Sequence, residues 1–442
     1  MKYLKEIKNG KLYYAGYCLK DLAEEFKTPL KITFLDVIKE RVLELKQAFS
    51  KAIKDNDYQG DFIYLNANKA NYGALEIETA YRYADGLETS SYYDLILTGD
   101  IFRREKDYQH HIVCNGYKPK EYIDEIEKVY KEGFKIIDII DSLDEYEELK
   151  KRNLALEVGL RIHLPALYID EKDVVKNDRF GLTKEEYFYI LDDLKNSKMI
   201  LSTIHFHQRG FDYEEEKFRL NFTKAFEEYY VTAAKRYKTV VNYNIGGGTP
   251  LPVSGNFDYY SWANEVIKLL KFLAKKNQVK EPNLLSENGK YSQKDATINL
   301  YKVVGVKNTD EYPWYIIDGS LMIAMPELFA LGEPIRVCPV NNLDREIIKV
   351  RLAGLTCDCD DIYFDKEKGY FLAPRESKDL YIACLGTGSY QNSMSGKGGV
   401  HHCLLPEERD VVIYRKNGKS VKKIRSELQS ISKIYRLMHF KK

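Results

Sequence analysis

The chain has 442 residues, of which 44% are hydrophobic and 31% are charged, and its formal net charge is +1. This balance argues against a nucleic-acid partner or an electrostatic membrane partner. No apolar run approaches the roughly 18 residues of a membrane-spanning helix, and the N-terminus lacks a signal-peptide core. Seven scattered cysteines are typical of reduced thiols. The sequence therefore predicts a cytoplasmic protein, long enough for two domains.

An amphipathic helix is expected from Phe34 to Ile53. From residue 61 onward, short apolar runs alternate with helical segments. Ser142-Leu-Asp-Glu145 and Thr183-Lys-Glu-Glu186 both fit the capping box that begins a helix. The eight apolar runs are Asp61–Asn66, Gly86–Ser90, His111–Asn115, Ile136–Asp141, Val158–Leu164, Met199–His207, Val240–Ile245 and Asn283–Glu287.

Eight strand–helix alternations predict an α/β fold, with a parallel (β/α)8 TIM-like barrel over residues 36–290. A doubly wound open sheet is the alternative. In both folds, polar residues at the carboxyl ends of the strands are the candidates for a functional site.

The helical period fades after about residue 295, where short strand-like segments are separated by turns. We expect a second, mainly β domain built from both chain ends, residues 1–35 and 291–442. The basic tail from Lys416 is expected to form a solvated helix. The strand-like segments are Leu300–Val306, Tyr312–Ile317, Ile335–Pro339, Asp361–Phe364, Leu380–Leu385 and Val411–Tyr414.

Four features stand at the ends of predicted barrel strands. Lys69 follows the first run, and Gly246, Gly247 and Gly248 follow the run that ends at Ile245. Three glycines let backbone amides approach an anion closely. The alternative interpretation is that they only allow a tight turn. Glu287 ends the last run, where a buried carboxylate could hold a protonated heterocyclic nitrogen; an exposed loop acid is the plainer interpretation.

His205-Phe-His207 supplies the fourth feature. We expect the alternation along the strand to turn the two imidazoles to opposite sides, one into the barrel mouth and one into the helix layer. A ring at the mouth could stack on a planar cofactor, whereas a lone strand histidine is more often structural.

Cys357 and Asp358 lie in an acidic turn of the second domain. Acidic neighbours disfavour a thiolate, so Cys357 suits proton donation better than nucleophilic attack. Cys359 and the run His401-His402-Cys403 also suggest zinc, but their spacing is not that of a structural zinc site. The sequence therefore predicts no metal.

Together, a lysine, an anion cradle, a stacking ring and a carboxylate at one barrel face describe a site for pyridoxal 5'-phosphate. The lysine would link the cofactor, the glycines would hold its phosphate, and the carboxylate would keep its pyridine nitrogen protonated.

With these features in place, the chain resembles the fold type III (alanine-racemase-like) pyridoxal-phosphate decarboxylases, and among them the arginine decarboxylases. The resemblance runs from about Thr28 to Pro406. It is carried by Lys69-Ala-Asn and by three longer segments, Val113-Cys-Asn-Gly-Tyr-Lys-Pro-Lys-Glu-Tyr-Ile123, Gly386-Thr-Gly-Ser-Tyr-Gln391 and His401-His-Cys-Leu-Leu-Pro406.

The resemblance implies a role for each candidate. Lys69 would carry the cofactor, His207 would stack on its ring and Glu287 would bind the ring nitrogen. The phosphate contacts would come from Gly246 to Gly248, with Tyr390 and Lys290.

In such a family the Cys-Asp pair comes from the partner subunit of a homodimer with shared active sites. Cys357 would then return a proton to Cα after carbon dioxide leaves. Asp358, with Asp361, would bind the distal cationic group of the substrate.

Two loops depart from the family pattern. His207-Gln-Arg-Gly210 stands where His-x-Gly-Ser is usual, so a serine phosphate contact is missing and Arg209 could substitute or crowd the cofactor. Glu287-Asn-Gly-Lys290 stands where Glu-Pro-Gly-Arg is usual, which keeps the charge but loses the bidentate fork.

The expected function is decarboxylation of a basic L-amino acid, arginine to agmatine first, a step of polyamine biosynthesis. Asp358 favours a cationic side chain. The alternatives are an ornithine, lysine or diaminopimelate decarboxylase, an amino-acid racemase, and a non-catalytic protein that binds pyridoxal phosphate.

Overall fold

The structure, a computed structural model, describes residues 3–163, 179–207, 215–251, 257–332 and 335–440. The chain forms two compact units. The barrel unit comprises Glu40–Leu251 and Phe257–Tyr291, and the β unit contains both chain ends, up to Lys39 and from Ser292 onward.

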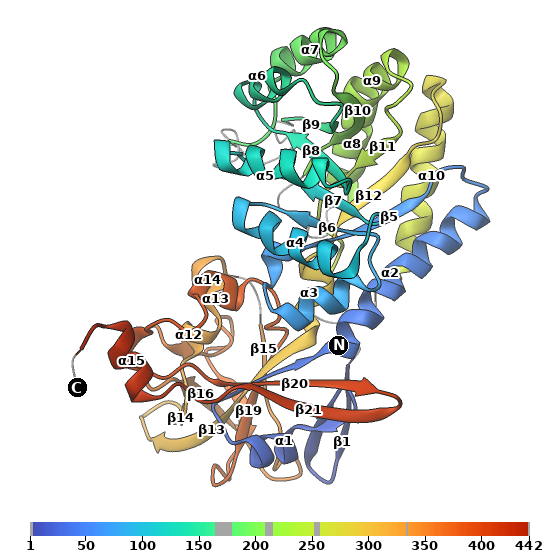
Figure 1. Cartoon of the computed structure of the whole chain (residues 1–442). Coiled ribbons are helices and arrows are strands. Elements are labelled where there is room, and N and C mark those ends of the chain that lie inside the picture. The colour runs from blue at the N-terminus through green and yellow to red at the C-terminus, as the bar shows by residue number, and fades with distance from the viewer. Residues whose placement is uncertain (1–2, 164–178, 208–214, 252–256, 333–334, 441–442) are drawn as a thin grey trace. The chain divides into compact units, whose positions relative to one another are not determined.

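The barrel unit contains a closed barrel of eight parallel strands in the order β10-β11-β12-β5-β6-β7-β8-β9 (Figure 1). The barrel closes where the last strand pairs with the first, with Leu284 opposite Phe62 and Glu287 opposite Leu65. The strands are β5 (Phe62–Ala67), β6 (Gly86–Thr89), β7 (His111–Cys114), β8 (Lys135–Ile140), β9 (Glu157–Arg161), β10 (Ile200–His205), β11 (Asn242–Asn244) and β12 (Asn283–Glu287).

Helices follow the strands and cover the barrel (Figure 1). The helical elements are α2 (Leu35–Asp55), η1 (Asn68–Ala70), α3 (Ala74–Tyr81), α4 (Tyr92–Glu105), α5 (Lys120–Lys131), α6 (Leu143–Arg152), α7 (Lys184–Asp193), η3 (Leu194–Asn196), α8 (Glu215–Ala225), η4 (Phe226–Tyr230), α9 (Val231–Arg236), α10 (Tyr259–Asn277) and α11 (Lys290–Gln293).

Apolar side chains fill two layers of this unit. Leu65, Val113, Ile137, Ile139 and Leu285 form a small cluster contributed by strands, while a large cluster joins the strands to the helices. A closed sheet buries both faces of its strands, which explains why the barrel strands read as short apolar runs in the sequence. The predicted (β/α)8 barrel is confirmed, and the open doubly wound sheet is wrong.

The two predicted capping boxes differ in the structure. At α7 the box is complete, because Thr183 and Glu186 each bond the backbone N–H of the other. At α6 the Ser142 side chain accepts from the N–H of Glu145, but the Glu145 carboxylate accepts from the N–H of Asp141 instead. The Glu145 side chain does not reach back to Ser142 because it also pairs with the buried Lys118.

The β unit contains a three-stranded sheet, β1-β2-β3, and a ten-stranded sheet. Strand β4 (Leu30–Phe34) runs antiparallel to β13 (Thr297–Lys307) and parallel to β20 (Arg409–Lys416), so it joins the N-terminal segment to the C-terminal part of the chain. The fold is thus the predicted barrel with a mainly β domain.

The remaining elements of the β unit are β1 (Leu4–Lys8), β2 (Lys11–Tyr14), β3 (Tyr17–Cys18), α1 (Leu19–Phe26), η5 (Lys294–Ala296), β14 (Trp314–Ile317), α12 (Leu321–Ala324), α13 (Pro326–Ala330), β15 (Arg336–Pro339), β16 (Ile347–Ala353), β17 (Ile362–Tyr363), β18 (Phe371–Pro374), β19 (Tyr381–Leu385), α14 (Gln391–Ser395), η6 (His402–Leu404), β21 (Lys419–Ser426) and α15 (Ile431–Leu437).

The prediction for the basic tail is wrong over its first part. Residues Lys419–Ser426 form β21, which pairs antiparallel with β20. The turn between the strands is Asn417-Gly418, both with positive φ (52° and 75°), and Asn-Gly is a strong signal for a two-residue hairpin. A helix forms only at Ile431–Leu437.

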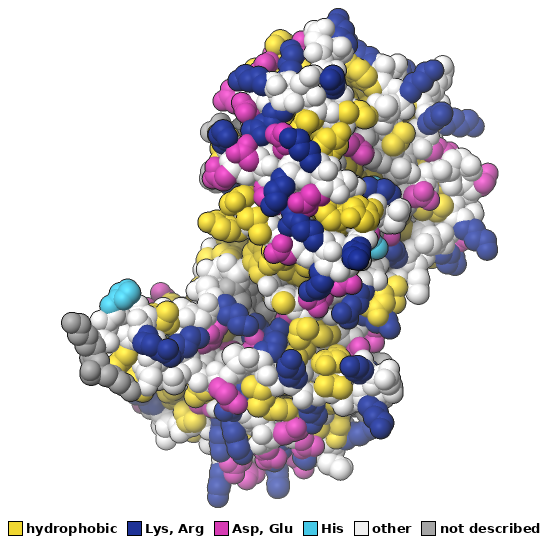
Figure 2. All heavy atoms as spheres, viewed as in Figure 1, with side chains coloured by type: hydrophobic (Ala, Val, Ile, Leu, Met, Phe, Trp, Pro, Cys, Tyr) yellow, Lys and Arg dark blue, Asp and Glu magenta, His cyan; other side chains and the backbone are white. Residues whose placement is uncertain are grey.

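The surface carries both signs of charge. Figure 2 shows lysine and arginine side chains interspersed with aspartate and glutamate over the visible face, in keeping with the net charge of +1. Among the described residues, no helix combines the length and the apolar character that crossing a membrane requires.

A buried lysine joins the loop that follows β7 to strand β8 and helix α6. Lys118 donates through Nζ to the carbonyl of Ile139 at 2.7 Å, and it lies 3.2 Å from Asp138 Oδ1 and 2.8 Å from Glu145 Oε1. Burial lowers the pKa of Lys118, but the two carboxylates outweigh burial and raise the pKa above its ordinary value. The charged triad therefore depends on all three partners.

Replacing Lys118 with methionine should lower the free energy of unfolding by about 3–5 kcal/mol, because two buried carboxylates lose their cation. Chemical denaturation measures the change. The control is Lys120→Met, which removes an exposed cation paired with Asp124 and should cost less than about 1 kcal/mol. Equal effects of the two variants would contradict a structural role for the triad.

Candidate functional site

The candidate site lies at the carboxyl ends of the barrel strands, which we call the barrel mouth. Lys69 lies in η1, directly after β5, and its Nζ donates to Glu88 Oε1 at 3.0 Å. The lysine side chain is 41% exposed, whereas the glutamate at the end of β6 is completely buried. Lys69 is thus an accessible amine held by a buried carboxylate.

A second buried carboxylate stands beside the first. Asn115, the residue after β7, donates through Nδ2 to Glu88 Oε1 and to Glu287 Oε2, both at 2.9 Å. Asn244 at the end of β11 donates to the other oxygen of Glu287 at 2.8 Å. One chain of contacts therefore runs from Lys69 through Glu88 and Asn115 to Glu287.

This chain strongly affects the protonation of Glu88. Desolvation raises the pKa of Glu88, the charge of Lys69 lowers it, and the nearby Glu287 raises it again. The net result is a pKa above its ordinary value. Glu88 is thus a carboxyl group that can hold a proton next to the lysine amine.

The two histidines lie on the same side of the chain, which corrects the prediction that they face opposite sides. His205 Nε2 is 3.7 Å from Glu287 Oε1, and the ring of His207 lies against Gly246 and Gly247. Phe206 between them is buried in the large cluster. Residues two apart in an extended chain share a face, so the parity argument should have placed both imidazoles at the mouth.

The surroundings of both imidazoles favour the neutral form. Burial lowers the pKa of His205 well below its ordinary value. Desolvation, with a smaller repulsion from Lys69, lowers the pKa of His207 to about 3, although the residue is exposed to solvent. A neutral, partly accessible ring suits stacking on a planar group.

The glycine run forms a close-packed loop. Gly246 has a φ of 65°, and a Cβ there would lie 2.7 Å from Nδ1 of His207. A Cβ on Gly247 would lie 2.9 Å from the carbonyl oxygen of Glu287. The N–H of Gly246 donates to the Asn244 side chain at 2.9 Å. Within the part of the chain that the structure describes, the N–H groups of Gly247 and Gly248 donate to no protein acceptor.

The loop after β12 packs against the lysine loop. A Cβ on Gly289 would lie 2.6 Å from the carbonyl oxygen of Ala67, two residues before Lys69. Lys290 begins α11 directly after this contact. Arg209, the other cation predicted near a phosphate, lies outside the described residues.

The residues at the mouth fit a pyridoxal phosphate. Buried polar atoms without a hydrogen-bond partner among the described residues gather there, namely Glu88 Oε2, Asn115 Oδ1 and both ring nitrogens of His205. Two unengaged amides of a glycine loop suit a phosphate, and a buried carboxylate fixed by two amides suits a heterocyclic nitrogen.

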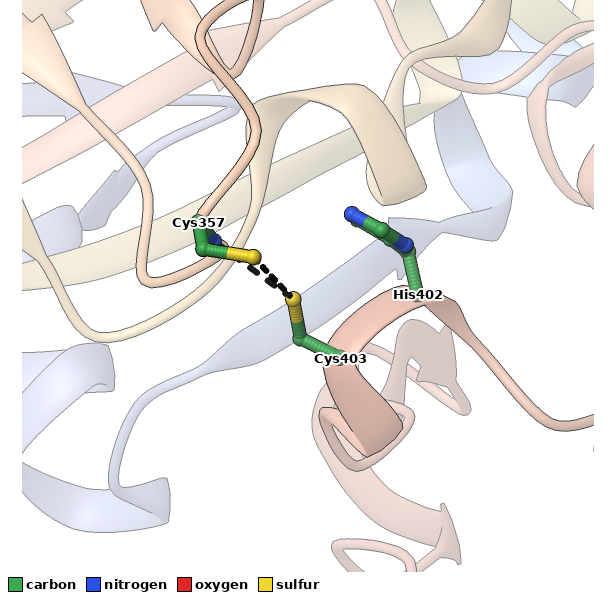
Figure 3. A group of neighbouring side chains, drawn as sticks. All are labelled: Cys357, His402 and Cys403. Atoms are coloured by element: carbon green, nitrogen blue, oxygen red, sulfur yellow. Dashed lines mark hydrogen bonds between the residues drawn. The ribbon is translucent and has the colours of Figure 1, made fainter.

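The remaining predicted residues lie in the β unit. Cys357 is exposed in the loop between β16 and β17, and its Sγ is 3.5 Å from Cys403 Sγ (Figure 3). The contact with Cys403 raises the pKa of Cys357, and Asp358 raises it further. Tyr390, with a φ of 61°, precedes α14.

Asp361 differs from its neighbour Asp358. Asp361 is 1% exposed, and its carboxylate accepts from the N–H groups of Leu321 and Met322 and from the hydroxyl of Thr356, at 2.9, 3.2 and 2.7 Å. These bonds brace the loop that carries Cys357. Asp358 is partly exposed and is the better candidate for a substrate contact.

Sequence reasoning missed Glu88, Asn115 and Asn244. Glu88 and Asn244 lie within apolar runs and Asn115 ends another, so their local sequence shows only strands. Their position at the carboxyl ends of parallel strands was the signal that could have revealed them.

Comparisons with known proteins find similar sequences and structures, although no protein-family model matches the chain. The biosynthetic arginine decarboxylase of Prochlorococcus marinus subsp. pastoris is 26% identical over 307 residues, covering 65% of this chain and 47% of the relative. The chain thus spans about half the length of the curated relatives that it matches.

Two crystal structures illustrate the shared fold. The biosynthetic arginine decarboxylase of Campylobacter jejuni has a TM-score of 0.83 at 20% identity, covering 99% of this chain and 90% of the other. A diaminopimelate decarboxylase from M. jannaschii has a TM-score of 0.80 at 21% identity, covering 98% and 97%. At these identities the likeness establishes the fold.

Replacing Asn115 with leucine should destabilise the protein by about 3 kcal/mol at neutral pH, because two buried carboxylates lose a shared donor. The variant should raise the pKa of Glu88 further above its unfolded value of about 4.3. A carboxyl whose pKa is higher when folded loses stability as pH rises, so the deficit should be smallest near pH 4 and grow toward pH 7.

Urea denaturation across this pH range tests the expectation. Asn196→Leu is the matched control, because Asn196 donates to the carboxylate of Asp193 at the surface, at 2.8 Å. That variant should change stability by less than about 1 kcal/mol at every pH. A deficit for Asn115→Leu that does not vary with pH would refute the coupling to Glu88.

Proposed function

We propose that this chain is a pyridoxal-phosphate-dependent decarboxylase of a basic L-amino acid, with arginine converted to agmatine as the first choice. The observation that carries the proposal is the chain of contacts from Lys69 through Glu88 and Asn115 to Glu287 at the barrel mouth. The names of the relatives support arginine as the substrate.

The barrel residues have distinct roles in this proposal. When bound, pyridoxal phosphate supplies a sink for the electron pair left at Cα as carbon dioxide departs. Lys69 would hold the cofactor through Nζ, which the substrate amine would displace. Glu88, 3.0 Å from Nζ, is placed to accept and return the protons that this exchange moves.

The remaining barrel contacts hold the cofactor in place. His207 offers a neutral ring for stacking, and Glu287 offers the ring nitrogen a carboxylate whose two oxygens are fixed by asparagine amides. The amides of Gly247 and Gly248 would hold the phosphate, with Lys290 and Tyr390 as the expected further contacts.

The β unit completes the site in a homodimer. Cys357 of the partner subunit returns a proton to Cα, which suits a thiol whose pKa is raised. Asp358 of the partner subunit pairs with the distal cation of the substrate. A monomer would lack both groups, so the proposal requires a dimer with two shared sites.

Thiol chemistry supports a cytoplasmic location for the proposed enzyme. The seven cysteines are all free in the structure, and three of them are exposed. An enzyme that uses an exposed thiol as its proton donor works best in a reducing environment, which favours the cytoplasm.

Purified protein loaded with pyridoxal phosphate should release carbon dioxide from arginine, less efficiently from ornithine and lysine, and at least about tenfold less efficiently from diaminopimelate, whose distal carboxylate lacks a partner at Asp358. The kcat/KM of the four substrates decides the order. Activity on diaminopimelate alone would overturn the proposal for a cationic substrate.

The lysine is tested with Lys69→Arg, which keeps the positive charge beside Glu88 but lacks a reactive primary amine. Activity should fall to background, while folding is retained. Borohydride reduction of the wild-type protein should leave reduced cofactor on the peptide that contains Lys69. Reduced cofactor on a peptide that contains another lysine would show that Lys69 does not carry the cofactor.

Replacing Cys357 with alanine should lower kcat by about 10²-fold, because the general acid is lost, or divert the product to one protonated incorrectly. KM for arginine should change little. Cys359→Ala is the matched control, since Cys359 is exposed in the same loop, and it should retain activity. A protein that only binds the cofactor would show no difference between the two variants.

A further inference from the structure

Three metal-ligating side chains meet on the β unit. Cys357 comes from the loop after β16, while His402 and Cys403 come from η6, and the two cysteines are 46 residues apart in sequence. One ligand atom from each of the three lies within 4.8 Å of the other two. Figure 3 shows the two sulfurs facing each other with the imidazole beside them.

The spacing of these atoms fits a tetrahedral ion. Two sulfurs bound to zinc at about 2.3 Å in tetrahedral geometry lie about 3.8 Å apart. The observed separation of the Cys357 and Cys403 sulfurs is 3.5 Å, so small side-chain movements suffice. Two thiolates and an imidazole favour zinc and similar thiophilic ions over magnesium or calcium.

A carboxylate stands behind the imidazole. Asp358 Oδ2 is 3.7 Å from Nε2 of His402, and Asp358 is partly exposed. At this distance the carboxylate does not form a hydrogen bond with the ring, but it adds a negative charge beside the three ligands, which favours a cation.

The backbone also holds the two loops together. The N–H of Cys357 donates to the sulfur of Cys403 at 3.4 Å. Cys403 has a left-handed backbone conformation, with a φ of 54°. The buried carboxylate of Asp361 fixes the Cys357 loop, because it accepts hydrogen bonds from the N–H of Leu321 and the hydroxyl of Thr356. The three ligands are exposed, so an ion can reach them from solvent.

We propose that Cys357, His402 and Cys403 bind one divalent cation of the zinc class, with water as the fourth ligand. Binding deprotonates both thiols, so two protons pass to solvent for each ion bound. The bound ion withdraws Cys357 from proton donation and thereby inhibits the enzyme reversibly. The inhibition, but not the binding, rests on the proposed function.

Cobalt(II) is the probe, because thiolate ligands give it charge-transfer absorption in the near ultraviolet and tetrahedral geometry gives strong visible bands. The full chain, reduced with a phosphine, is titrated with cobalt and then with zinc. We expect one cobalt per chain, both signals, and complete displacement by zinc. Absence of the charge-transfer signal in the wild-type protein would overturn the proposal.

Variants identify the ligands. Cys403→Ser and His402→Ala should each weaken cobalt binding at least about tenfold, as expected when a ligand or its support is lost. Cys359→Ser removes an exposed thiol of the same loop that is outside the trio and should bind as the wild type does. Unchanged binding by Cys403→Ser would also refute the site. All substituted residues are exposed, and circular dichroism verifies folding.

Activity separates this proposal from the proposed function. Micromolar zinc should inhibit the wild-type decarboxylase and chelation should restore it, whereas the activity of Cys403→Ser, measured against its own zinc-free rate, should not fall in zinc. If the protein decarboxylates no amino acid, cobalt absorption still decides whether the metal site exists. If it is an active decarboxylase that shows no cobalt–thiolate signal, only the metal site is rejected.

Discussion

The burial of two carboxylates at one barrel mouth is the constraint on which the site depends. Glu88 and Glu287 are both buried and repel each other, so each needs a compensating partner. The amide of Asn115 bonds both, and Lys69 supplies the cation. Removing Lys69 takes the cation from Glu88, and removing Asn115 takes a donor from both carboxyl groups.

Barrel closure makes this arrangement possible. Glu287 ends the last strand and Lys69 follows the first, and they become neighbours only because β12 pairs with β5. Parallel strands place all their carboxyl ends at the same rim, so β6, β7 and β11 contribute Glu88, Asn115 and Asn244 to one cluster. In an open sheet, the first and last strands would not hold a shared site.

The sequence reveals residues whose local context is unusual, and it hides residues that act through pairing. Lys69 and the glycine run stand out because they interrupt the chain directly after apolar runs. Glu88 lies inside such a run, and its role depends on a partner 19 residues away in sequence. Cys357 and Cys403 are separated by 46 residues, so local spacing argues against a metal where the fold brings their sulfurs together.

Cys357 shows how one side chain can serve two chemistries that exclude each other. A proton donor must keep its proton, and the contact with Cys403 raises the pKa of Cys357 accordingly. A metal ligand must lose that proton, and the same contact places a second sulfur at the distance that an ion requires. Protons and thiophilic ions therefore compete for one pair of sulfurs. Because Cys403 would touch neither the substrate nor the cofactor in the proposed reaction, its nearness to Cys357 is better explained by control of the thiol.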